Sequence, residues 1–130
     1  MPLPGHVRIL IVDDDFAFRE SLRKILSKAG YVVDEASGAT HALALMAMEK
    51  FDIVFSDMKM PGMSGLDLLK TIKQNYPEVH VVLLTAHNEL ASHVEALNLQ
   101  ASGFLCKPVK RHEILEALES LTASDHESRQ

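Results

Sequence analysis

Polar side chains that suit phosphoryl and metal chemistry follow four apolar segments of this 130-residue chain. Three aspartates, Asp13 to Asp15, come directly after the first apolar run, and Asp57, Thr85 and Lys107 each follow one of the other three. In an open parallel sheet, ligand sites form beyond the carboxyl ends of the strands. If the apolar runs are strands of one such sheet, these carboxylates, the hydroxyl and the ammonium converge on one crevice. Together they could bind a divalent cation and a phosphoryl group.

The acidic side chains need a positive partner. Asp13, Asp14 and Asp15 repel one another and also repel the carboxylate of Asp57, if that lies beside them. Mg²⁺ is a hard cation that takes oxygen ligands, typically one or two carboxylates together with several waters. The alternative is that the aspartates cap the following helix, where a carboxylate opposes the helix dipole. The two interpretations are compatible, because Asp15 can cap while Asp13 and Asp14 serve a metal.

Two periodicities alternate along the chain and predict the elements that carry these residues. Strands are predicted from short apolar or β-branched runs at 7–12, 31–34, 52–56, 79–84 and 102–106. Helices are predicted from apolar residues with helical spacing in 16–29, 39–49, 65–75, 88–98 and 111–122. Strands that alternate with helices indicate an α/β fold, in which a five-stranded parallel sheet is covered by helices on both faces.

The polarity of the strands predicts their order in the sheet. The runs at 7–12, 52–56 and 79–84 are apolar enough for interior positions, whereas those at 31–35 and 102–106 are more polar or shorter and suit the edges. The doubly wound order 2-1-3-4-5 satisfies this pattern. Its switch point lies between the first and third strands, so it predicts that Asp13–Asp15 lie beside Asp57.

Composition excludes several classes of function. A net charge of −5 gives no electrostatic reason to expect binding to nucleic acid or to a membrane surface. No apolar stretch has the length of a membrane span, and the first residues lack the apolar segment of a secretory signal. The single cysteine, Cys106, allows no intramolecular disulfide and fits a cytoplasmic protein. Seven scattered histidines lack the paired spacing of a zinc site.

The length predicts one domain, with short additions at each end. We expect an N-terminal extension at 1–6, a folded domain at 7–122, and a polar tail or the start of a linker at 123–130.

The chain resembles a known family, the receiver domain of two-component response regulators, whose fold is flavodoxin-like with five strands and five helices. The resemblance covers residues 7–122 and rests on an ordered set of motifs: Val12-Asp13-Asp14-Asp15, Asp57-Met58-Lys59-Met60-Pro61-Gly62-Met63-Ser64-Gly65, Leu84-Thr85-Ala86 and Lys107-Pro108.

This resemblance implies that Asp57 accepts a phosphoryl group from a phosphohistidine of a sensor histidine kinase or a histidine phosphotransfer protein. It implies that Mg²⁺ is the cofactor, bound directly by Asp14 and Asp57, through a water by Asp13, and by the backbone carbonyl of Lys59. The Lys107 ammonium would pair with a phosphoryl oxygen.

The resemblance also implies a switch. Thr85 would donate its hydroxyl to the phosphoryl group, and Phe104 would change its packing in response. The resulting output face would comprise the predicted helix 88–98, the strand 102–106 and the helix 111–122, and a partner or a second copy would dock there. The Lys107-Pro108 bond is expected to be cis, and Lys59 and His87 are expected to alter the lifetime of the aspartyl phosphate.

Two other interpretations stay open at this point. A Mg²⁺-dependent phosphatase could use an aspartyl nucleophile of the Asp13-x-Asp15 pair, although it would leave the Asp57-x-x-Met-Pro motif without a role. Alternatively, the chain could be a receiver that binds partners through its surface without being phosphorylated.

Overall fold

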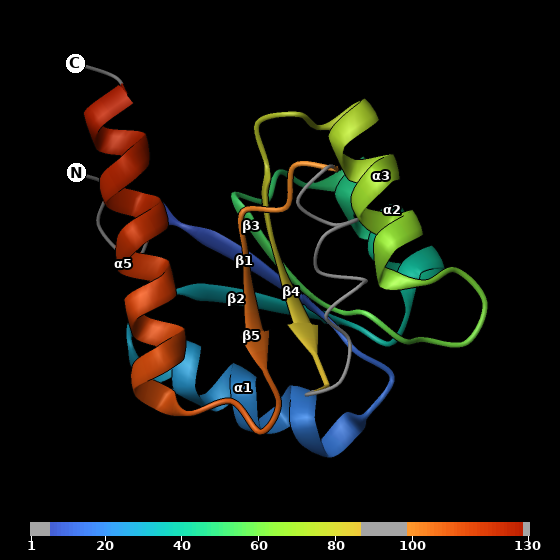
Figure 1. The fold of residues 1–130 in the computed structure, drawn as a ribbon, viewed down its shortest axis with the longest axis horizontal. Coiled ribbons are helices and arrows are strands. Elements are labelled where there is room, and N and C mark those ends of the chain that lie inside the picture. The colour runs from blue at the N-terminus through green and yellow to red at the C-terminus, as the bar shows by residue number, and fades with distance from the viewer. Residues whose placement is uncertain (1–5, 87–98, 129–130) are drawn as a thin grey trace.

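One five-stranded parallel sheet forms the centre of the protein, as a computed structural model shows (Figure 1). The structure describes residues 6–86 and 99–128. The strand order is β2-β1-β3-β4-β5, which confirms the order predicted from strand polarity, with the two more polar strands at the edges. The strands are β1 (Arg8–Val12), β2 (Val32–Ala36), β3 (Ile53–Asp57), β4 (His80–Thr85) and β5 (Gly103–Cys106).

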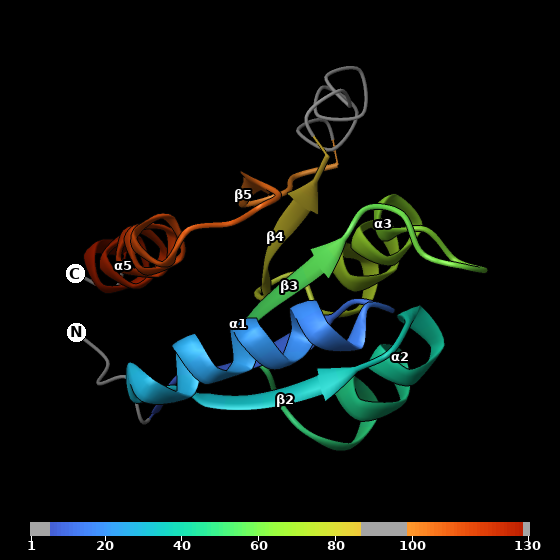
Figure 2. The same ribbon diagram turned by 90° about the horizontal axis from the view of Figure 1, so that it is seen from below.

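Helices cover both faces of this sheet (Figure 2). The described residues contain four of them: α1 (Phe16–Lys28), α2 (Ala39–Met48), α3 (Gly65–Asn75) and α5 (Arg111–Ser128). The helix predicted at 88–98 lies outside the described residues, as does His87. Within the described part of the chain, no helix is both long and apolar enough to cross a bilayer.

The central strands separate two apolar cores. Along β1, Leu10 and Val12 face the core under α2 and α3, while Ile9 and Ile11 face the core under α1 and α5. All four side chains are fully buried. Successive side chains of a strand point to opposite faces, so a strand covered on both sides must be apolar throughout. This explains why β1 is a continuous apolar run in the sequence. Because β1 is packed on both sides, the residues that directly follow it are held in a defined position.

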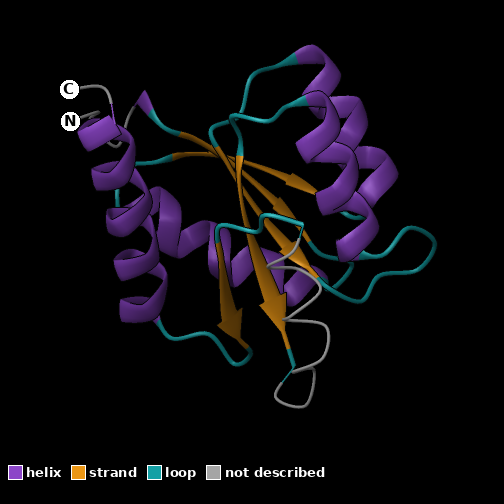
Figure 3. Cartoon of the chain, turned by 45° about the horizontal axis from the view of Figure 1, so that its top comes forward, coloured by secondary structure: helices purple, strands orange, loops and turns teal. Residues whose placement is uncertain are grey.

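The polypeptide leaves the sheet in the same direction after every strand (Figure 3). The connection from β1 to α1 is fixed by a helix cap. Asp15 caps α1, since its Oδ1 accepts a hydrogen bond of 3.2 Å from the backbone N–H of Phe18. At the other end of α1, Gly30 has a φ of +99°, the left-handed conformation that commonly ends a helix. The cap agrees with the prediction that Asp15 can cap this helix, and it fixes the start of α1 directly after Asp13 and Asp14.

The last helix differs from its prediction. It was expected to end at 122, but α5 continues to Ser128. Residues 123–128 lack the apolar spacing from which the helix was predicted, so the pattern gave no signal for them. They also contain neither glycine nor proline, and nothing in their backbone chemistry stops a helix that is already formed.

Candidate functional site

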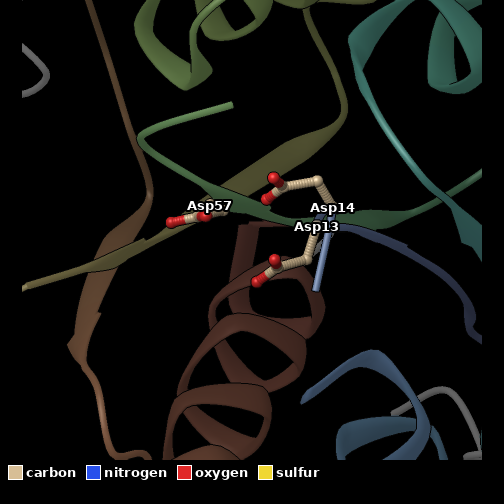
Figure 4. Close-up of side chains that lie close together, drawn as sticks. All are labelled: Asp13, Asp14 and Asp57. Atoms are coloured by element: carbon tan, nitrogen blue, oxygen red, sulfur yellow. The ribbon is translucent and has the colours of Figure 1, made fainter. Parts of the chain in front are cut away.

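Three carboxylates meet at the ends of two neighbouring strands (Figure 4). Val12 of β1 is paired with Ser56 of β3, so Asp13 and Asp57 follow as the next residues on adjacent strands. One oxygen from each of Asp13, Asp14 and Asp57 lies within 4.8 Å of the other two. The juxtaposition expected at the switch point is therefore present.

Asp13 is the buried member of the cluster, with no exposed surface. Its Oδ1 accepts a hydrogen bond of 2.9 Å from the backbone N–H of Asp15, and its Oδ2 accepts one of 2.8 Å from Lys107 Nζ. Its backbone carbonyl accepts a further bond of 2.7 Å from the Arg19 guanidinium. Both carboxylate oxygens are thus engaged within the protein, whereas Asp14 is exposed and Asp57 is partly exposed.

Lys107 reaches the cluster from the far edge of the sheet. It follows β5, and its backbone N–H donates a bond of 2.8 Å to the carbonyl of Thr85. Its Nζ lies 2.8 Å from Asp13 Oδ2 and 3.6 Å from Asp57 Oδ2, so a single ammonium contacts both carboxylates. The Lys107-Pro108 bond is cis, as predicted.

The surroundings raise the pKa of both Asp57 and Lys107. Burial raises the pKa of the Asp57 carboxyl, and the charge of Asp13 raises it further. The Lys107 ammonium and a backbone hydrogen bond from Lys59 lower the same pKa without cancelling the rise. For Lys107, burial opposes the charged form, but the hydrogen bond and charge of Asp13, followed by those of Asp57, outweigh it and raise the pKa. The negative charge of Asp57 is therefore only partly neutralised by its neighbours, and the Lys107 side chain remains positively charged.

The charge balance of the cluster indicates what it can bind. Three carboxylates lie around the ammonium of Lys107, which contacts two of them, so the cluster holds more carboxylates than the one ammonium can neutralise. A divalent cation would neutralise this excess, and all the available donors are oxygen atoms, the ligands that Mg²⁺ prefers. The residues present therefore fit Mg²⁺.

The hydroxyl and the aromatic residue expected to form the switch lie on the last two strands. Thr85 ends β4, is 1% exposed, and has its Oγ1 at 3.6 Å from Cys106 Sγ on β5. Because Asp57 pairs with Leu84, Thr85 is one residue beyond the strand position opposite Asp57. Phe104 is half-buried, sits opposite Leu83, and packs against the core under α2 and α3. Thr85 thus lies at the end of the strand next to that of Asp57, and Phe104 lies one strand further out.

The loop after β3 explains the spacing of the Asp57-x-x-Met-Pro-x-x-x-Gly motif. Gly62 has a φ of +79°, which permits the turn after Pro61. A Cβ on Gly65 would lie only 2.2 Å from the backbone oxygen of Asp57 and 2.7 Å from Met58 Cα. Only glycine allows α3 to begin this close to the strand end, and the backbone N–H of Gly65 donates a hydrogen bond of 3.0 Å to the Met58 carbonyl. Lys59 is exposed in this loop.

Two side chains of α1 belong to the site although the sequence did not single them out. Lys107 Nζ lies 4.3 Å from the centre of the Phe18 ring. Arg19 holds the Asp13 carbonyl and also contacts Glu35 of β2, 3.2 Å away. From spacing alone, Phe18 belongs to the apolar face of α1. Its contact with a residue from the far edge of the sheet has no signature in the local sequence.

Comparison with known proteins gives one consistent family. The family described as response regulator receiver domain matches residues 9–119. Response regulator MprA of Mycolicibacterium vanbaalenii is 37% identical over 115 residues, which are 88% of this chain and 50% of that protein. Response regulator protein FleR of Pseudomonas aeruginosa is 38% identical over 109 residues, 84% of this chain and 23% of FleR. The chain thus spans half or less of the length of these curated relatives.

Solved structures give the same picture. The signal receiver domain of an HD domain-containing protein from Pseudomonas fluorescens superimposes with a TM-score of 0.88 at 34% identity, covering 93% of this chain and 98% of that one. A CheY-like response regulator receiver domain protein from Methanospirillum hungatei gives a TM-score of 0.87 at 35% identity, covering 93% and 98%.

Proposed function

The chain belongs to the response regulator receiver domain family, and from this premise we propose that it takes a phosphoryl group onto Asp57 and thereby switches an output face. Receiver domains of this family take phosphoryl groups from histidine kinases and act as signalling switches. We propose that the donor is a phosphohistidine of a sensor histidine kinase or a histidine phosphotransfer protein in the cytoplasm. The observation that carries the proposal is the carboxylate cluster around Asp57, bridged by Lys107.

The bond changes of the transfer are simple. An Asp57 carboxylate oxygen attacks phosphorus, and an acyl phosphate P–O bond forms. The P–N bond to the donor imidazole breaks and its electron pair stays on that nitrogen. The donor leaves as a neutral imidazole because its other ring nitrogen carries a proton. Phosphoryl transfer of this kind depends on positioning and on compensation of negative charge.

Mg²⁺ would supply part of that compensation by neutralising charge on the phosphoryl oxygens. We propose Asp14 and Asp57 as direct ligands, since their carboxylates are the accessible ones in the cluster. We propose that Asp13 acts through a water, because both of its oxygens already accept hydrogen bonds within the protein. The backbone carbonyl of Lys59 completes the proposed protein ligands.

Lys107 supplies the second positive charge. Its raised pKa keeps the ammonium charged, and its Nζ already lies 3.6 Å from Asp57 Oδ2. As the Asp57 carboxylate becomes an acyl phosphate, the negative charge moves outward onto the phosphoryl oxygens. We propose that Lys107 then pairs with one of these oxygens.

The proposed switch follows from the same charge movement. The Thr85 hydroxyl would turn towards the phosphoryl group and leave space that Phe104 could occupy, which biases a two-state element. The output face would comprise the segment 88–98, which lies outside the described residues, together with β5 and α5. A partner or a second copy of the chain would dock there.

The chain would act as a switch that catalyses its own phosphorylation and slow dephosphorylation, not as a turnover enzyme. We propose that Lys59, exposed beside Asp57, and His87, outside the described residues, set the rate of this dephosphorylation. Because the chain spans about half of its first curated relatives, any effector activity of a longer protein would lie in another part.

The rival phosphatase mechanism is disfavoured by the positions of its two aspartates. Asp15 caps α1 through its side chain, and Asp13 is fully buried with both oxygens engaged. An attacking carboxylate needs an oxygen that a phosphoryl group can reach, and Asp57 is better exposed for this. The interpretation as a receiver that works without phosphorylation gives the clustered carboxylates and Lys107 no chemical role.

Incubation with a small phosphodonor and Mg²⁺, followed by intact mass measurement and site mapping, tests the proposal. We expect a gain of one phosphoryl group, located on Asp57 and absent in Asp57→Asn. A label on Asp13 or Asp15 would support the phosphatase instead. Binding of a partner that is equal with and without the label would support the phosphorylation-independent receiver.

A further inference from the structure

We propose that Phe18 is a positioning residue for phosphoryl transfer, because its ring holds the Lys107 ammonium over Asp13 and Asp57. This inference rests on the proposed function and deepens it. It concerns a residue of α1 that the motifs of the sequence do not include.

The contact joins parts of the chain that are far apart in sequence. Phe18 lies in the first turn of α1, whose start is fixed by the Asp15 cap through the backbone N–H of Phe18 itself. Lys107 follows β5 at the opposite edge of the sheet. The distance of 4.3 Å from Nζ to the ring centre is well inside the range of about 6 Å for a cation–π interaction.

The ring occupies a position that no carboxylate could fill equally well. A lysine ammonium sits on a flexible four-carbon stem, and burial or partners must restrict it. Asp13 and Asp57 attract the ammonium, but an additional carboxylate would compete with an incoming phosphoryl group for it. A neutral aromatic face attracts the cation without adding negative charge to the site.

Phe18 is itself held in place. It is half-buried and packs against the core under α1 and α5. The ring therefore offers a rigid surface, while 28% of the Lys107 side chain remains exposed. The ammonium can shift towards a phosphoryl oxygen and keep the ring as its support.

Two matched variants separate the aromatic face from the apolar volume. Phe18→Leu keeps an apolar side chain without a ring, and Phe18→Tyr keeps the ring. Initial rates of Asp57 labelling by a small phosphodonor at saturating Mg²⁺ are measured over a range of donor concentrations. We expect Phe18→Leu to lower the maximal rate about three- to tenfold, with little change in the half-saturating donor concentration. We expect Phe18→Tyr to restore the rate to within about twofold.

A Lys107→Met background tests whether Phe18 acts through the ammonium. Adding Phe18→Leu to Lys107→Met should slow labelling no further, since the group that Phe18 positions is already gone. An equal loss in both backgrounds would assign Phe18 a purely structural role and overturn the inference. So would a wild-type rate in Phe18→Leu, or an equally low rate in Phe18→Tyr. If thermal unfolding shows that Phe18→Leu does not fold, Phe18→Met takes its place.

A second measurement needs no phosphorylation. In NMR spectra, the Lys107 ε-methylene protons should show an upfield ring-current shift that disappears in Phe18→Leu and persists in Phe18→Tyr. An unshifted Lys107 in the wild-type protein would overturn the contact and the inference with it. If the shift is present but wild-type Asp57 takes no label, the proposed function fails and the role of Phe18 fails with it. If the wild type is labelled and Phe18→Leu keeps its rate, only the inference about Phe18 fails.

Discussion

The Asp57 side chain occupies surroundings that oppose its ionisation and thereby prepare it for a cation. Burial and the neighbouring Asp13 raise its pKa, and Lys107 with the Lys59 backbone offsets only part of this effect. A carboxylate with a raised pKa is destabilising when ionised and gains most from a nearby positive charge. The same imbalance that costs stability in the metal-free protein favours metal binding.

The first prediction follows from this cost. Between the ordinary pKa of Asp57 and its raised pKa, the folded protein binds more protons than the unfolded chain, so its free energy of unfolding falls as the pH rises. Above the raised pKa the penalty is fully present. Asp57→Asn should therefore raise the melting temperature of the metal-free protein by a few degrees at pH 7, measured by thermal unfolding in a chelator.

The increase in melting temperature caused by Asp57→Asn should become smaller as the pH is lowered to the ordinary pKa of an aspartate. The carboxyl of the folded wild-type protein is then protonated and no longer destabilises it. Glu116→Gln, an exposed substitution on α5, serves as the control and should leave the melting temperature nearly unchanged. A lower melting temperature for Asp57→Asn at neutral pH would contradict the account.

At the level of single residues, the sequence predicted that the carboxylates cluster at the ends of neighbouring strands, and the structure confirms this. It did not predict that Lys107 also contacts Phe18. The adjacent aspartates and Asp57 are visible because each directly follows an apolar strand, and parallel strands end at the same edge. Phe18 and Arg19 were not predicted, because an aromatic or basic residue on a helix gives no local sign of a partner on a distant strand.

Among the elements, the start of α3 is the most tightly constrained. Gly65 lets the helix approach the end of β3 so closely that any Cβ would meet the Asp57 carbonyl at 2.2 Å. Two pieces of backbone must therefore separate if a side chain is added, and this would move Asp57 itself.

The second prediction is that Gly65→Ala lowers the free energy of unfolding by about 1–3 kcal/mol or more, the usual cost of overpacking. It should also slow Asp57 labelling by a small phosphodonor. Denaturant unfolding gives the stability, and initial labelling rates give the second effect. Gly103→Ala in β5 is the matched control, because a Cβ there has no atom within 4 Å, and it should change stability by less than about 0.5 kcal/mol. Equal stabilities for the two variants would refute the close approach.

The elements also show where periodicity stops being informative. The strand order was predictable because buried interior strands must be apolar and the two edge strands are more polar. The end of α5 was not, because a helix that is already formed continues through polar residues that carry no periodic signal. The helix predicted at 88–98 stays a prediction, since it lies outside the described residues.

For the whole molecule, the metal site should couple to global stability. A ligand that binds only the folded state stabilises it by mass action, by about 2.7 kcal/mol at a concentration one hundred times its Kd. The carboxylates of the cluster come from the ends of β1 and β3, so binding there supports the centre of the sheet.

The third prediction is that Mg²⁺ raises the melting temperature in a concentration-dependent manner. Asp14→Asn should shift this dependence to higher Mg²⁺ concentrations, because it removes an exposed ligand without disturbing the core. Glu116→Gln should respond as the wild type does. A melting temperature that is independent of Mg²⁺ in the wild type, or a response in Asp14→Asn that matches it, would show that the cluster does not bind the metal.

The most direct test of the whole account is a crystal structure determined with Mg²⁺ and beryllofluoride, a mimic of the phosphoryl group. We expect Mg²⁺ coordinated by Asp14 and Asp57, beryllofluoride on the Asp57 carboxylate, and Lys107 paired with one of its fluorines. A crystal grown under these conditions with no Mg²⁺ among the three carboxylates, or with beryllofluoride on a residue other than Asp57, would contradict it.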